Sequence, residues 1–178
     1  YGRPVGSVAA VTFDKLGQIR TVAVEHSDGT FFPYDLDHIM IQGDEVILIP
    51  VWKAKAQRLE SAIRAAQSKL TALDQLVQGG RISQSTYEEL RKSYVRSLEE
   101  LEEKRKELIG TLKGRVSQLR TEAHELEKFL AKIEVDHMTG DLDEESYRLL
   151  GNSLRATLAR LVSEIKDIEE ILAKLSAG

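Results

Sequence analysis

The sequence of 178 residues contains no cysteine, which excludes disulfide bonds and thiolate metal sites and fits an intracellular protein. No apolar run reaches the ~18 residues of a membrane-spanning helix, and no secretory leader pattern is present. We therefore expect a soluble protein. The formal net charge of -4 argues against a surface that attracts nucleic acid or anionic lipid over its whole extent.

Aromatic residues are also scarce, at 6% of the chain, and Asn152 is its one asparagine, whereas charged residues make up 30%. Two interpretations fit this composition. One is a solvated coiled coil; the other is a protein from a thermophile, in which Lys and Glu are enriched and thermolabile residues are rare. The composition leaves both open.

Motifs that carry catalysis are missing: the chain has no P-loop, GxGxxG, HExxH or nucleophile elbow. His26, His38 and His124 have no nucleophile motif nearby, so we interpret them as structural or exposed. We expect no enzyme, no cofactor and no small-molecule substrate. An enzyme whose β domain holds a small ligand is a weak hypothesis, because a very small barrel is filled by its own side chains.

One polar cluster is dense enough to be tested as a metal site: Asp136, His137, Asp141, Asp143, Glu144 and Glu145. A calcium loop with acids at Asp141, Asp143 and Glu145 requires glycine where Ser146 stands. A zinc site would find one histidine and no cysteine. We interpret the cluster as a turn followed by the acidic first turn of a helix, and expect no metal.

What the sequence does contain is helical periodicity. Residues 84–138 predict one amphipathic helix, whose length at ~1.5 Å per residue makes it a rod rather than part of a compact domain. Heptad seams flank it on both sides and predict helices at about 52–78 and 144–176. The seam residues are Trp52, Ala56, Leu59, Ile63, Ala66, Leu70, Leu73 and Val77 before it, and Leu154, Leu158, Leu161, Ile165, Ile168, Leu172 and Leu175 after it.

An internal repeat separates these helices: residues 80–90 align without gaps onto residues 140–150. We interpret each copy as a helical turn with a glycine that ends one helix, an N-cap that begins the next, and a tyrosine that packs on the residue before the cap. These turn residues are Gly80, Ser83 and Tyr87 in the first copy, and Gly140, Asp143 and Tyr147 in the second. The sequence therefore predicts two antiparallel hairpins that share the long central helix.

The middle of the long helix departs from the heptad spacing, because Leu108, Leu112 and Val116 are separated by fours. Gly110 and Gly114 lie inside this stutter and are a possible hinge, since each weakens a helix by up to about 1 kcal/mol relative to alanine. Counting from the two turns places Trp52 and Leu172 both opposite Gly110. We expect the flanking helices to meet there, with the N-terminal domain beside the middle of the rod.

Residues 1–50 have a different pattern. Short alternating apolar runs are separated by Gly-containing turns, which predicts a series of hairpins. Five short strands fit a small closed barrel better than a sandwich, with one helical turn at residues 35–39. The expected fold class is α+β: a β domain over residues 1–50 and a helical coiled-coil domain over residues 51–178.

The N-terminal motifs suggest a family. Residues 2–8 (GRPVGSV), Asp14 with residues 17–19 (GQI), and residues 43–48 (GDEVIL) resemble the PRC-barrel pattern. A PRC-like barrel followed at once by a long coiled coil is similar to the archaeal cell-division CdvA family of the ESCRT-III-linked Cdv system. The resemblance implies a non-enzymatic, filament-forming scaffold in the cytoplasm, at the division site on the inner face of the cell membrane. It implies three partners: itself, an ESCRT-III-like protein bound through a C-terminal segment that we expect to lie beyond this chain, and DNA or the membrane surface.

Two features bear on those partners. Val95, Ile109, Phe129, Leu149 and Val162 flank the seams, so we expect a second chain to cover them. Six basic residues are candidate contacts for phosphates or lipid head groups: Lys104, Arg105, Lys106, Lys113, Arg115 and Arg120. The interleaved glutamates favour an ion-paired, solvated face instead. The alternative function is a nucleic-acid or ribosome-associated adaptor that uses the PRC-like barrel.

Overall fold

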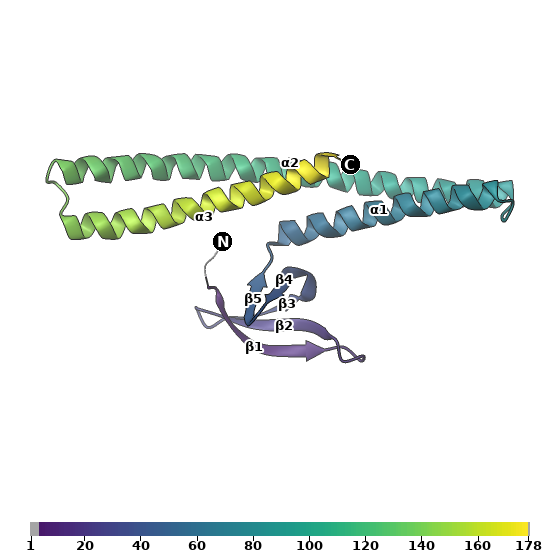
Figure 1. Cartoon of the computed structure of the whole chain (residues 1–178), viewed down its shortest axis with the longest axis horizontal. Coiled ribbons are helices and arrows are strands. Elements are labelled where there is room, and N and C mark those ends of the chain that lie inside the picture. Colours follow the sequence, from purple (N-terminus) through teal and green to yellow (C-terminus); the bar gives the residue numbers. More distant parts are fainter. Residues whose placement is uncertain (1–3, 178) are drawn as a thin grey trace. The chain divides into compact units, whose positions relative to one another are not determined.

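The computed structural model describes residues 4–177, apart from the side chain of Asp37. Five strands and a short 3-10 turn precede three helices, so the fold is α+β as expected (Figure 1). The chain forms two compact units, and the division between them falls between Lys106 and Glu107, inside the second helix. Each unit is described separately below.

The first unit begins with two small antiparallel sheets. Strands β1 (Gly6–Phe13), β2 (Ile19–His26) and β3 (Phe31–Asp35) form one sheet in the order β1-β2-β3. The 3-10 turn η1 (Leu36–His38) leads into a second sheet made of β4 (Ile39–Gln42) and β5 (Glu45–Leu48). Glycines with positive φ occupy the three hairpin turns, at residues 17, 29 and 43.

The expected closed barrel is wrong, because the strands stay in two separate sheets. Within residues 4–177, strand β1 pairs with β2 alone, and all eight of its residues are exposed. Val22, Val24 and Ile39 are the buried core residues of these sheets. Closure needs a partner for the free edge of β1 and enough inward side chains to fill the interior, and strands of four to eight residues with so small a core provide neither.

Helix α1 (Val51–Gln78) follows directly, with Pro50 at its N-cap. It runs antiparallel to the first part of α2 (Gln84–Met138), as contacts between Asp74 and Tyr87 and between Lys69 and Tyr94 show. Counting from the turn, which places Trp52 opposite Gly110, predicts the partner of each α1 residue on α2. Both observed contacts lie within one residue of the predicted partner. Every residue of the predicted α1 seam is buried or half-buried. The predicted seam is therefore the face of α1 that is shielded from solvent. Ala54, which is not a seam residue, is buried as well.

The second unit contains the rest of α2 and α3 (Glu144–Ala177). The α2 side is buried at Leu108, Leu112, Val116, Leu119, Ala123 and Ile133, and the α3 side at Gly151, Ile168, Ile171 and Leu175. All three helices begin and end within one residue of the positions expected from the sequence. Leu108, Leu112 and Val116, which are spaced four residues apart in the stutter, are all buried, and α2 is helical throughout. The meeting of α1 and α3 beside Gly110 stays a prediction.

Candidate functional site

The two helical turns have the same backbone structure. Gly80 has a φ of 64° and Gly140 a φ of 82°, in the left-handed region that suits a residue just after a helix. The Gly80 N–H donates to the Val77 carbonyl at 3.0 Å, and the Gly140 N–H donates to the His137 carbonyl at 3.1 Å. These bonds satisfy carbonyls at the end of each helix, so both turns reverse the chain in the same way.

Each following helix begins with a side-chain cap. The Ser83 hydroxyl accepts the Thr86 N–H at 3.2 Å, and a carboxylate oxygen of Asp143 accepts the Ser146 N–H at 2.9 Å. Hydrogen bonds from the backbone and the hydroxyl of Ser146 lower the pKa of Asp143 below its ordinary value. Asp143 is therefore a charged cap at neutral pH.

Each repeated tyrosine binds an acid on the preceding helix. Tyr87 donates its hydroxyl hydrogen to Asp74 at 2.8 Å, and Tyr147 donates to Glu134 at 2.8 Å. The bond to Asp74 raises the pKa of Tyr87. Sequence analysis missed both acids, because it gave the tyrosines an apolar packing role. The missed signal was present, since Asp74 and Glu134 are themselves sixty residues apart and extend the repeat toward the N-terminus.

The second turn carries further polar contacts. The ring of His137 stacks on Tyr147 with centroids 4.2 Å apart, and its Nε2 lies 2.9 Å from a carboxylate oxygen of Glu144. Arg155 donates to the Tyr147 hydroxyl at 3.3 Å. This is where the polar cluster considered as a metal site lies. Over residues 4–177 no group of three His, Asp or Glu side chains is arranged to hold a metal ion.

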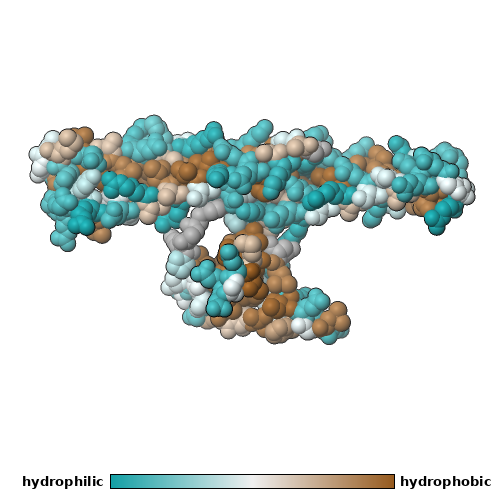
Figure 2. Space-filling view, in the orientation of Figure 1, coloured by the Kyte–Doolittle hydropathy of each residue, from teal (hydrophilic) through white to brown (hydrophobic). Residues whose placement is uncertain are grey.

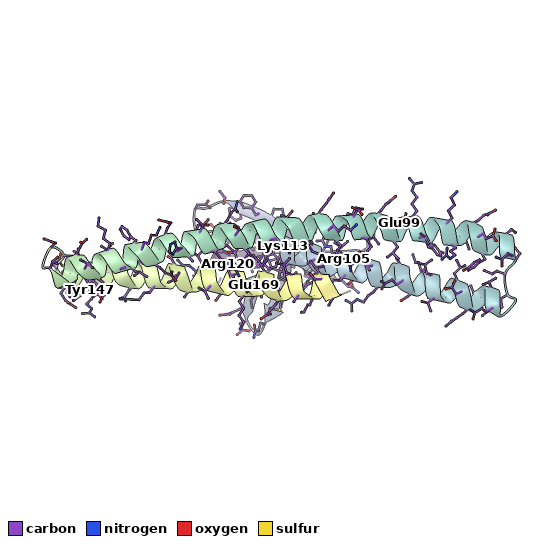
Figure 3. The ribbon with its side chains drawn as sticks, turned by 90° about the horizontal axis from the view of Figure 1, so that it is seen from above. Glu99, Arg105, Lys113, Arg120, Tyr147 and Glu169 are labelled. Atoms are coloured by element: carbon purple, nitrogen blue, oxygen red, sulfur yellow. The ribbon has the colours of Figure 1, made fainter. Side chains whose placement is uncertain are left out.

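The six candidate basic residues divide between the two units, and the structure pairs four of them with glutamates. In the first unit Arg105 pairs with Glu102 at 2.8 Å and Lys106 with Glu103 at 2.7 Å. In the second unit Arg115 pairs with Glu164 at 3.0 Å and Arg120 with Glu169 at 2.7 Å; Figure 3 shows the latter pair. Among the described residues no ion pair holds Lys104 or Lys113.

Lys113 and Arg120 share a shallow groove of about 530 Å³ in the second unit. Its lining combines cationic, hydroxyl and apolar groups: Lys113, Val116, Ser117, Arg120, Thr121, His124, Glu169 and Leu172. Glu169 already neutralises Arg120 there. Among the cationic residues that line the groove, Lys113 is the one that no ion pair holds within the described residues.

Apolar side chains that stay exposed on the helices are a second candidate for contact with a partner; Figure 2 shows apolar residues on the surface. In the second unit Leu149 is 72% exposed, Val162 54% and Phe129 48%. We call these three residues the exposed apolar set. Val95 and Ile109, expected with them, are half-buried. A contiguous apolar patch on a protein surface indicates an interaction site, whereas apolar side chains that are exposed singly are normal.

Gly110 and Gly114, the candidate hinge, are both exposed within continuous helix. A Cβ atom built at either position meets no other atom within 4 Å. Close packing therefore does not require glycine at these positions. Any requirement for them lies in the flexibility or curvature of α2, or in close approach of a second chain.

None of the helices within residues 4–177 has both the length and the apolar character to cross a membrane. Comparison with known proteins identifies a relative: the chain is 22% identical over 175 residues to "Cell division protein A" of Sulfolobus acidocaldarius, covering 98% of this chain and 73% of the relative. No solved structure matches the chain. A family model, the CdvA-like coiled-coil domain, matches residues 51–177, which include all three helices. The chain therefore belongs to the CdvA-like coiled-coil family and is related to an archaeal cell-division protein.

Proposed function

We propose that the protein is a non-enzymatic scaffold of archaeal cell division that assembles with copies of itself into filaments. The observation that carries the proposal is the exposed apolar set on the second unit. Phe129, Leu149 and Val162 lie on helices whose own pairing leaves them in water. Burying such side chains is worth about 25 cal/mol per Å² of apolar surface, so a second copy that covers several of them stabilises an assembly.

The test compares two neighbouring lysine substitutions on α3. Sedimentation velocity and negative-stain electron microscopy across a range of concentrations should show the natural sequence assembling. Val162→Lys should shift the distribution toward smaller species, because it places a charge in the buried contact. Ser163→Lys adds the same charge at the next exposed position and should leave assembly unchanged. A natural sequence that stays monomeric at every concentration contradicts the proposal.

We also propose that the scaffold works in the cytoplasm on the inner face of the membrane at the division site, where it positions an ESCRT-III-like partner. The support is family membership and the likeness to a cell-division protein. Co-sedimentation with vesicles of anionic lipid, with and without an archaeal ESCRT-III-like protein, tests it, using this chain joined to the C-terminal segment that we expect to bind the partner. Recruitment of that protein to vesicles only when the scaffold is present is the expected result. Equal recruitment without the scaffold contradicts it.

A second candidate function is nucleic-acid or anionic-lipid binding, favoured by one observation, the unpaired Lys113 in the groove beside Arg120. Because phosphate contacts release counterions, the logarithm of affinity for duplex DNA should fall linearly with the logarithm of salt concentration. Lys113→Gln should reduce that slope by about 0.9, the contribution of one phosphate contact. An unchanged slope removes Lys113 from any such contact.

A further inference from the structure

The two edge strands of the three-stranded sheet, β1 and β3, differ in residues that affect pairing with another chain. Strand β3 carries Pro33, which has no N–H to donate, and ends at Asp35. Proline and charge, like β-bulges, are among the features that keep an exposed strand from pairing with another chain. Strand β1, at the opposite edge, has eight residues and contains no proline and no charged residue. Register shifts between Val8 and Ala10 and between Thr12 and Phe13 interrupt its pairing with β2, but over the described residues no strand pairs with its outer edge.

The face of β1 is as open as its edge. All eight residues are exposed, including Val8 at 45%, Val11 at 37% and Phe13 at 61%. Val8 lies opposite Val24 and Val11 opposite Val22, and both partners are buried core residues. Val8 and Val11 thus belong to the core face of the sheet but lack cover. A strand added beside β1 would extend that face and shield them.

The order of residues in β1 indicates which strand could be added beside it. Residues 7–12 read Ser-Val-Ala-Ala-Val-Thr, which is the same in both directions when Ser and Thr are taken as one class. A shift in register between Val8 and Ala10 also places Val8 and Val11 on one face. A two-fold axis brings a strand against its own reversed copy, so a pairing of this type needs a self-complementary sequence. The absence of charge means that no like charges meet in such a pair.

We propose that β1 pairs antiparallel with β1 of a second copy across a two-fold axis near Ala9 and Ala10, which joins two three-stranded sheets into one of six strands. Val8 of each copy then lies beside Val11 of the other. This contact closes on itself and yields a dimer, not a filament. The β1 contact can form whether or not the protein assembles into filaments, and only its role in a filament rests on the proposed function. A filament requires two interfaces, which would be the β1 contact and the contact that buries the exposed apolar set.

The absence of cysteine makes a direct test possible. Single variants Ala9→Cys and Ala10→Cys place a thiol beside the axis, so mild oxidation should link two copies by a disulfide in high yield. Lys15→Cys places an equally exposed thiol in the turn after β1, far from the axis, and should remain largely unlinked. Equal yields at all three positions, or no link at residues 9 and 10, would overturn the proposal.

A second set of variants separates this contact from the helical one. In the Ala9→Cys background, Val8→Lys should lower the disulfide yield at least about fivefold, since a lysine on an edge strand prevents pairing. Phe31→Lys removes a larger exposed side chain from β3, at the other edge, and should leave the yield unchanged. Val162→Lys should also leave it unchanged, even where it abolishes larger assemblies. Loss of the link in Phe31→Lys or Val162→Lys contradicts pairing through β1, whereas loss of assembly alone counts only against the proposed scaffold.

Discussion

At the scale of the residue, the two turns share one polar contact that holds adjacent helices in register. A tyrosine donates to an acid thirteen residues earlier, across the turn, at 2.8 Å in both copies. The hydrogen bond between the hydroxyl and the carboxylate adds to apolar packing in setting the position of one helix along the other. Repetition of the pair after sixty residues indicates that register matters at both hairpins.

The hydrogen bond to Asp74 should control the ionisation of Tyr87. Asp74→Ala removes both the hydrogen-bond acceptor and the negative charge, so the pKa of Tyr87 should fall toward its ordinary value of 10.0. The raised pKa means that this contact contributes stability below pH 10 and that the contribution is lost as pH rises through the folded-state pKa. Absorbance at alkaline pH, with Tyr87→Phe subtracted to isolate one phenol, measures the shift. Glu134→Gln, at the other turn, should leave it unchanged.

The cap at Asp143 should make α3 sensitive to acid. Its pKa is lowered in the folded state, so its contribution to stability is present above the ordinary value of 3.8 and is lost as pH falls through the folded-state pKa. Urea unfolding between pH 6 and about pH 2 measures this loss. Asp143→Asn retains a good cap without a titrating group, and should show a smaller decline over the same range. Equal declines in the two proteins would show that other carboxylates account for it.

At the scale of the element, α2 combines a regular buried seam with two glycines that packing does not explain. Gly110→Ala and Gly114→Ala should each stabilise the helix by up to about 1 kcal/mol, because glycine loses more backbone entropy than alanine and the added methyl group meets open space. Thermal unfolding followed by circular dichroism checks this. Gly140→Ala is the matched control and should destabilise, since its φ of 82° strains any residue with a Cβ atom.

Loss of assembly in a protein that gains stability would show that assembly requires these glycines, through flexibility of α2 or through close approach of a second copy. Unchanged assembly would leave them without a role in it. A loss of stability in either alanine variant would contradict the open space found around these glycines.

At the scale of the whole molecule, the proposed scaffold depends on apolar contact between copies, whereas binding to DNA or acidic lipid depends on charge. The two respond to salt in opposite ways. Raising salt from about 0.1 M to about 1 M shortens the screening length from about 10 Å to 3 Å, so charge-dependent binding should weaken strongly. Self-assembly measured by sedimentation should persist. Dissolution of the assemblies at high salt would assign them to ion pairs instead.

The sequence by itself determined the features that depend on near neighbours. Helix bounds, left-handed glycines and side-chain caps follow from periodicity and from hydrogen bonds that span a few residues, so they are readable in one dimension. The apolar seams were also readable, because a face at heptad spacing must be buried wherever its partner lies.

Only the tertiary structure decided the long-range pairings. Arg115 and Arg120, for example, pair with glutamates that are 49 residues away in the chain. The sheet edge that stays open in place of a closed barrel was settled in the same way, since closure depends on interior volume and on strands that meet across the sheet. No local pattern contains that information, because such contacts form only when distant segments are brought together.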